Sequence, residues 1–126
     1  MIRVLIADDK ETSRELIRTV LDSLGHEVRE ASNGLEAVRY AKEQPPDLII
    51  LDLHMPLLDG FGALAEIRGD QNLATIPIMA LTASAMQGDR ERALTAGFDS
   101  YVTKPIPLAR LRQEITRLLE RSGNRN

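Results

Sequence analysis

The sequence predicts an α/β fold in which five parallel strands alternate with five helices. Five short aliphatic segments are separated by longer segments whose apolar residues recur at helical spacing. The run Leu48-Ile49-Ile50-Leu51 contains no polar residue, as in a strand that is buried on both faces. Short connections and this regular alternation favour a parallel sheet with helices on both faces.

The composition is typical of one domain with an aliphatic core. The chain has 126 residues, of which 43% are hydrophobic, and two Phe and two Tyr are its only aromatic residues. The formal net charge of -3 argues against a nucleic-acid partner, because such surfaces usually carry a basic stripe. The lack of cysteine excludes disulfides and thiolate metal sites. No apolar stretch approaches the ~20 residues of a membrane span and the N-terminus has no signal-peptide layout, so we expect cytoplasmic localisation and no membrane insertion.

The strands are expected in five short apolar segments, at residues 2–7, 27–31, 47–52, 76–81 and 100–103. The second strand is the weakest, because Val28 is its best apolar residue, and we expect it at a sheet edge. The third follows Pro45-Pro46, which interrupts regular structure. Pro77 lacks a backbone donor, which is tolerable near the start of the fourth strand.

The helices are expected in five segments with helical periodicity, at residues 12–24, 34–43, 58–68, 84–96 and 107–121. Thr12 and Glu15 fit a capping box for the first helix, which can begin a residue or two earlier, and Gly25 suits its left-handed stop. Asn33 is expected to cap the second helix, and Pro107 suits the first turn of the last. The last helix is expected to bury Leu108, Leu111, Ile115, Leu118 and Leu119.

Functional side chains follow four of the predicted strands. Asp8 and Asp9 follow the first strand, Asp52 ends the third, Thr82 follows the fourth and Lys104 the fifth. The carboxyl ends of parallel strands share one edge of the sheet, where ligands bind in open α/β folds. Two like charges about 4 Å apart repel by roughly 4 kcal/mol at an effective dielectric of about 20, so clustered carboxylates hold protons or recruit a cation. Hard oxygen ligands with room for water favour Mg²⁺.

Each of these residues taken alone has an ordinary structural explanation. An aspartate after a strand is commonly a turn or helix cap, and Lys104 beside Pro105 would most often be a solvated loop lysine. Thr82 taken alone is a β-branched strand residue. Their joint occurrence at four strand ends is therefore what indicates a functional site.

Several short motifs follow one another in a specific order between residue 2 and about residue 121. They are Asp8-Asp9, Asp52 with Met55-Pro56, Asp59-Gly60, Leu81-Thr82-Ala83, and Tyr101-Val102-Thr103-Lys104-Pro105. Together they resemble the receiver domain of two-component response regulators. The resemblance implies a flavodoxin-like (βα)5 three-layer sandwich with strand order 2-1-3-4-5 and a cis peptide bond between Lys104 and Pro105. We expect a receiver (response regulatory) domain over residues 1–121 and a flexible C-terminal tail at residues 122–126.

The resemblance also assigns the phosphorylation site and the metal ligands. Asp52 would accept a phosphoryl group from a histidine kinase or histidine phosphotransfer protein. Asp9, Asp52 and the backbone carbonyl of His54 would bind the cofactor Mg²⁺ directly, and Asp8 would hold metal-bound water.

Further residues are assigned to catalysis, switching and the lifetime of the phosphoryl group. Lys104 and the hydroxyl of Thr82 would contact the phosphoryl oxygens. Thr82 and Tyr101 would act as the switch, which repacks the surface of the fourth helix, fifth strand and fifth helix. His54 and Ser84 border the path of hydrolytic water and would tune the lifetime of the phosphoryl group.

This resemblance describes a signalling switch and not an enzyme for a separate substrate. Its partners would be a phosphodonor and a downstream protein target, and phosphorylation-dependent dimerisation would be compatible with it. The sequence contains no DNA-binding output domain. It leaves open whether the chain is a stand-alone regulator or a receiver from a hybrid histidine kinase or larger regulator.

Three other classes share parts of this pattern. A haloacid-dehalogenase-type phosphatase needs a second aspartate two residues after the nucleophile, where this chain has His54. A flavodoxin-like electron carrier needs a Ser/Thr/Gly-rich loop after the first strand, where this chain has Asp8-Asp9-Lys10. A receiver-shaped interaction module that never takes phosphate is disfavoured by the complete set of acidic residues with the threonine and lysine.

Overall fold

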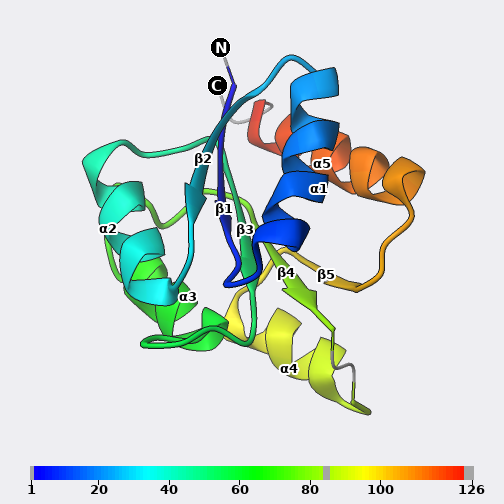
Figure 1. Cartoon of the computed structure of the whole chain (residues 1–126). Helices are drawn as coiled ribbons and strands as arrows, with labels where there is room; N and C mark the ends of the chain where they lie inside the picture. Colours follow the sequence, from blue (N-terminus) through cyan, green and yellow to red (C-terminus); the bar gives the residue numbers. More distant parts are fainter. Residues whose placement is uncertain (1, 84–85, 124–126) are drawn as a thin grey trace.

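A computed structural model describes residues 2–83 and 86–123 and shows a five-stranded parallel sheet between two layers of helices (Figure 1). The strands are β1 (Arg3–Ala7), β2 (Glu27–Ala31), β3 (Leu48–Asp52), β4 (Ile78–Thr82) and β5 (Ser100–Thr103). The helices are α1 (Glu11–Ser23), α2 (Gly34–Glu43), α3 (Gly60–Arg68), α4 (Asp89–Ala96) and α5 (Leu108–Gly123). The strand order β2-β1-β3-β4-β5 confirms the expected flavodoxin-like topology.

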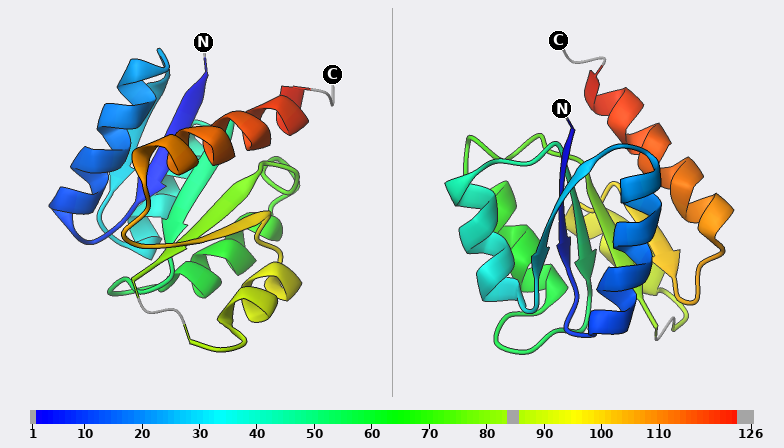
Figure 2. Two further views of the ribbon diagram at one scale, coloured as in Figure 1. Left: turned by 90° about the vertical axis from the view of Figure 1, so that its right-hand side faces the viewer. Right: turned by 45° about the horizontal axis from the view of Figure 1, so that its top comes forward.

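The sheet separates two apolar cores. Helices α1 and α5 cover one face, and α2, α3 and α4 cover the other (Figure 2). Strand β3 lies at the centre of the sheet and is buried over its whole length. Its residues alternate between the faces, so Ile49 and Leu51 join one core while Leu48 and Ile50 join the other.

The register of the strands aligns their carboxyl ends. Asp52 at the end of β3 pairs with Leu81, and Thr82 at the end of β4 pairs with Thr103. Because the strands are parallel, the loops that follow β1, β3, β4 and β5 all leave the sheet at this edge. The edge therefore gathers side chains that are far apart in the sequence.

The predictions for the second strand and helix are confirmed. Strand β2 lies at the edge of the sheet. The side chain of Asn33 accepts a hydrogen bond of 2.8 Å from the backbone N–H of Glu36 and caps α2.

Among residues 2–83 and 86–123, no helix has the length and apolar character that crossing a bilayer would require.

Helix α1 starts within the range that was predicted, but without the predicted cap. The helix begins at Glu11 and its N-cap residue, Lys10, makes no side-chain cap, so the capping box expected at Thr12 is wrong. The backbone N–H of Lys10 donates instead to Oδ1 of Asp8 at 2.9 Å. The loop after β1 thus sets the helix start. Gly25 has a φ of 78° and follows the helix end, as predicted.

Helices α3 and α4 begin later than predicted. Helix α3 begins at Gly60, because the side chain of Asp59 caps it by accepting from the N–H of Gly62 at 2.8 Å. Helix α4 begins at Asp89 and not at residue 84. Residues 84–85 of the predicted helix lie outside the described residues.

Helix α5 buries most of the apolar face that was predicted. Leu108 is an exception, with 48% of its surface exposed at the first residue of the helix, and Leu119 is partly buried. The fully buried residues are Leu111, Ile115 and Leu118. The helix continues through Gly123, past the boundary expected at residue 121, and residues 124–126 of the expected tail lie outside the described part.

Candidate functional site

Three carboxylates converge at the carboxyl edge of the sheet. Asp8 and Asp9 follow β1, Asp52 ends β3, and one oxygen from each lies within 4.8 Å of the others. Asp8 is fully buried and Asp52 is 4% exposed, whereas Asp9 is open to solvent. The structure therefore brings together the acidic residues that the sequence predicted to meet.

Lys104 approaches two of these carboxylates from the end of β5. Its Nζ lies 2.6 Å from Oδ2 of Asp8 and 3.2 Å from Oδ2 of Asp52. Three carboxylates against one ammonium group leave two net negative charges in the cluster. Excess negative charge on hard oxygen atoms suits a divalent cation such as Mg²⁺, so the residues present fit the expected metal.

Burial and neighbouring charges shift the pKa values of this site. Burial raises the pKa of Asp52, because a poorly solvated site disfavours the charged carboxylate. The backbone N–H of His54 and the ammonium of Lys104 lower it, Asp8 raises it, and the pKa remains above its usual value. Burial lowers the pKa of Lys104, but the hydrogen bond with Asp8 and the two nearby carboxylates raise it more. Lys104 therefore stays positively charged at neutral pH.

Backbone donors orient the two buried carboxylates. Oδ1 of Asp8 accepts from the N–H of Lys10 at 2.9 Å, and Oδ1 of Asp52 accepts from the N–H of His54 at 3.0 Å. Each aspartate thus bonds to the amide two residues further along. In both residues the second oxygen, Oδ2, contacts Lys104. The two carboxylates are therefore held at both oxygens.

The end of β3 also packs tightly against the start of α3. A Cβ atom at Gly60 would lie 2.5 Å from the carbonyl oxygen of Asp52 and 2.8 Å from the Cα of Leu53. These atoms belong to the backbone and cannot give way as a flexible side chain can. Any larger residue at position 60 would therefore force the end of β3 and the start of α3 to shift apart.

The other predicted site residues lie around this cluster. Thr82 is fully buried at the end of β4, and the side chain of His54 is exposed, as expected. Tyr101 on β5 is 8% exposed. Its buried hydroxyl has no hydrogen-bond partner in the described part of the chain, and burial raises its pKa. Ser84 lies outside the described residues, so its expected role stays a prediction.

An apolar groove opens beside Lys104, between the start of α1 and the segment after β5. Its lining includes Leu16, Ala83, Pro105 and Ile106. Leu16 is 43% exposed there. The peptide bond between Lys104 and Pro105 is cis, which confirms the expectation.

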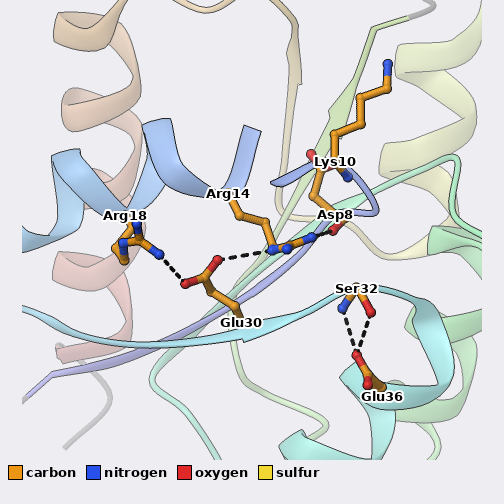
Figure 3. Close-up of polar contacts among 7 residues, drawn as sticks. All are labelled: Asp8, Lys10, Arg14, Arg18, Glu30, Ser32 and Glu36. Atoms are coloured by element: carbon orange, nitrogen blue, oxygen red, sulfur yellow. Dashed lines mark hydrogen bonds and ion pairs between the residues drawn. The ribbon is translucent and has the colours of Figure 1, made fainter. Parts of the chain in front are cut away.

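Two residues on α1 that the sequence analysis did not single out contact the site. Ser13 accepts a hydrogen bond of 3.3 Å from Nζ of Lys104. Nη1 of Arg14 donates to the backbone carbonyl of Asp8 at 2.7 Å (Figure 3). The feature of the sequence that could have pointed to Ser13 and Arg14 is their position in the first turn of a helix that starts shortly after the acidic pair.

The fold and the site together define a flavodoxin-like α/β domain with a cluster of three carboxylates at the carboxyl edge of its sheet. The family model for the response regulator receiver domain matches residues 4–116. The chain therefore belongs to the response regulator receiver domain family.

Curated relatives and solved structures agree with this membership. The polar-differentiation response regulator DivK of Brucella anthropi is 38% identical over 112 residues, which cover 89% of this chain and 91% of the relative. The receiver domain of sensor histidine kinase PA1611 from Pseudomonas aeruginosa PAO1, solved with a magnesium ion in its active site cleft, is 39% identical. Its TM-score is 0.87, with 94% of this chain and 98% of that chain covered.

The fold itself extends to more distant proteins. A CheY-like receiver domain protein from Methanospirillum hungatei JF-1 has a TM-score of 0.92 at 22% identity, with 100% of this chain and 99% of that chain covered. At this identity the likeness concerns the fold alone.

Proposed function

We propose that this receiver domain accepts a phosphoryl group on Asp52 from the phosphohistidine of a histidine kinase or histidine phosphotransfer protein. The observation that carries the proposal is the placement of Asp52 between a lysine and two other aspartates. Its Oδ2 lies 3.2 Å from Nζ of Lys104, and one of its carboxylate oxygens lies within 4.8 Å of oxygens of Asp8 and Asp9. The carboxylate is therefore available as a nucleophile beside the groups that phosphoryl transfer needs.

The transfer would exchange one bond to phosphorus for another. A carboxylate oxygen of Asp52 attacks phosphorus and forms a P–O bond, while the P–N bond to the donor histidine breaks. The bonding pair leaves with the imidazole nitrogen, which takes up a proton from solvent, and Asp52 becomes an acyl phosphate. The ammonium of Lys104, which already contacts Asp52, offsets negative charge on the phosphoryl oxygens.

The acidic cluster would hold Mg²⁺. Asp9, Asp52 and the backbone carbonyl of His54 are the proposed direct ligands, and Asp8 would hold metal-bound water. Support comes from the convergence of the three carboxylates and from the magnesium ion in the PA1611 receiver. When bound, Mg²⁺ would neutralise charge on the attacked phosphoryl group.

Thr82 and Tyr101 would transmit the change to the surface formed by α4, β5 and α5. The Thr82 hydroxyl would bond a phosphoryl oxygen at the end of β4. Tyr101 is already buried, with an unpartnered hydroxyl among the described residues, so switching would change what this hydroxyl contacts. His54 and Ser84 would tune the lifetime by controlling the approach of water.

The partners follow from the surfaces around the site. The apolar groove is lined in part by Lys104, which contacts Asp52, and it suits the helix bundle of a phosphodonor. A downstream target protein, or a second phosphorylated copy, would use the surface of α4, β5 and α5. The protein would thus be a cytoplasmic switch and phosphoprotein that catalyses only its own phosphorylation and dephosphorylation, alone or within a larger regulator.

Incubation with Mg²⁺ and acetyl phosphate, followed by intact mass measurement, tests this function. The parent protein and Asp59→Asn, a control that changes an exposed aspartate, are expected to gain one phosphoryl group. Asp52→Asn is expected to gain none. Labelling of Asp52→Asn, or a parent protein that neither takes up phosphate nor binds beryllofluoride, would contradict the proposal.

A further inference from the structure

Arg14 connects the acidic loop after β1 to the edge strand β2. Its Nη1 donates to the backbone carbonyl of Asp8 at 2.7 Å, and its Nε donates to Oε1 of Glu30 at 3.0 Å. Figure 3 shows the guanidinium lying between these two groups. One side chain therefore holds two segments that are distant in the sequence.

Strand β2 also holds Asp8 directly, through the backbone N–H of Asp8. The N–H of Asp8 donates to the carbonyl of Ala31 at 3.1 Å, and Ala31 directly follows Glu30 in β2. Asp8 is thus fixed at its N–H by the strand and at its carbonyl by an arginine that the strand anchors. The two contacts together set the orientation of the peptide planes on either side of Asp8.

The link between Arg14 and Glu30 is shielded from water. The side chains are 17% and 27% exposed, so screening weakens this pair less than a fully exposed one. Nη1 of Arg18 lies 2.6 Å from Oε2 of Glu30, so each oxygen of Glu30 contacts a different arginine. Among the contacts of the described residues, Arg14 reaches Asp8 and Arg18 does not.

The orientation of the Asp9 carboxylate depends on the backbone contacts of Arg14 more than the orientation of the Asp8 carboxylate does. The carboxylate of Asp8 contacts Lys10 and Lys104. The carboxylate of Asp9 has neither a hydrogen bond nor an ion pair within residues 2–83 and 86–123. The backbone alone therefore sets the direction in which the Cα–Cβ bond of Asp9 leaves the chain, and the Asp8–Asp9 peptide is the plane that Arg14 holds.

We propose that Arg14 is a positioning residue that aims the carboxylate of Asp9 at the cation site by holding the carbonyl of Asp8. This inference rests on the proposed function, because it assumes that Mg²⁺ binds at the acidic cluster. Glu30 anchors the guanidinium of Arg14 through Oε1, while Arg18 contacts the other oxygen of Glu30. A residue on the edge strand thus contributes to metal binding without contacting the metal.

Magnesium titrations of Arg14→Gln and Arg18→Gln, followed by the NMR amide signals of residues 8–10, test the inference. Both variants lose an ion pair with Glu30, but only Arg14→Gln loses the contact with Asp8. We expect the Mg²⁺ dissociation constant to rise roughly 10-fold in Arg14→Gln, as for other residues that orient metal ligands. Arg18→Gln should bind Mg²⁺ like the parent, and Arg14→Lys should recover part of the loss because its ammonium can still donate to the carbonyl.

A second measurement uses the metal-free protein. Amide hydrogen exchange at Lys10, whose N–H bonds to Asp8, should accelerate in Arg14→Gln and stay unchanged in Arg18→Gln. If Arg14→Gln does not fold, Glu30→Ala serves in its place, because it removes the acceptor that anchors Arg14 and leaves Arg14 itself intact. It should then weaken Mg²⁺ binding and accelerate exchange at Lys10.

The outcomes separate this inference from the proposed function. Equal losses of stability in Arg14→Gln and Arg18→Gln, with Mg²⁺ binding and Lys10 exchange as in the parent, would leave Arg14 a purely structural role and overturn the inference alone. A parent protein that neither bound Mg²⁺ nor took up a phosphoryl group would overturn the proposed function and this inference with it.

Discussion

Lys104 and Asp52 lie 52 positions apart in the sequence, yet Nζ of the lysine meets Oδ2 of the aspartate at 3.2 Å. The same Nζ reaches Asp8, which is 96 positions away, at 2.6 Å. These residues lie at the ends of β5, β3 and β1. The charges of the site are therefore linked to the stability of the whole sheet.

Replacing Lys104 with Met should destabilise the protein, because Asp8 and Asp52 would remain close together without a cation. We expect a loss of about 3 kcal/mol in the free energy of unfolding, measured with urea in the absence of Mg²⁺. Adding Mg²⁺ should recover part of it. Lys10→Met, which changes an exposed lysine, is the control, and equal losses in the two variants would contradict the electrostatic explanation.

Asp52→Asn should stabilise the metal-free protein at neutral pH. Since the folded pKa of Asp52 is raised above its unfolded value, its contribution to stability is fully present below the unfolded pKa and is lost as the pH rises through the folded pKa. The neutral amide avoids this loss, so we expect a gain of roughly 1 kcal/mol at pH 7 that shrinks as the solution is acidified. Urea unfolding across this pH range measures it, and a variant less stable than the parent at pH 7 would refute the expectation.

Gly60→Ala should damage the fold beneath Asp52. The added Cβ would lie 2.5 Å from the carbonyl oxygen of Asp52, so β3 and α3 would have to separate. Overpacking of this kind costs about 2 kcal/mol in the free energy of unfolding. Gly69→Ala is the matched control, because its nearest neighbour would lie at 3.4 Å and its φ of -76° suits alanine. Similar unfolding midpoints in both variants would show that the close approach relaxes easily.

Tyr101→Phe should raise the free energy of unfolding of the unphosphorylated protein. The substitution removes a buried hydroxyl that lacks a partner among the described residues, and such a group costs about 1 kcal/mol or more. Urea unfolding measures the gain, with Tyr40→Phe, a half-buried tyrosine on α2, as control. A loss of stability in Tyr101→Phe would mean that the hydroxyl is hydrogen-bonded in solution.

The sequence predicted the sheet and the acidic cluster for the same reason. A strand such as β3 is apolar throughout because it is central, and the rule that parallel carboxyl ends share an edge then places Asp52 with Asp8 and Asp9. Neither step needs knowledge of side-chain contacts. The arrangement of the acidic residues therefore follows from the apolar pattern of the strands and their parallel direction.

The remaining features depend on individual contacts that no pattern along the chain shows. Helix α1 begins at Glu11, after a turn in which the backbone N–H of Lys10 donates to Asp8, and it lacks the capping box expected at Thr12. The contact between Arg14 and Glu30 joins residues 16 positions apart, and charged residues at such separations carry no periodic signal. Leu108 fits the apolar spacing of α5, yet it is the first residue of the helix and stays exposed.

The distribution of the functional residues over separate strands also makes the domain suitable for division into two pieces. A cut between α3 and β4, in residues 69–77, would leave Asp8, Asp9 and Asp52 on one fragment and Thr82 with Lys104 on the other. This connection lies at the edge of the sheet opposite the acidic cluster. Labelling of the first fragment would then require the second, so radioactive acetyl phosphate could report when two fused proteins come together in solution.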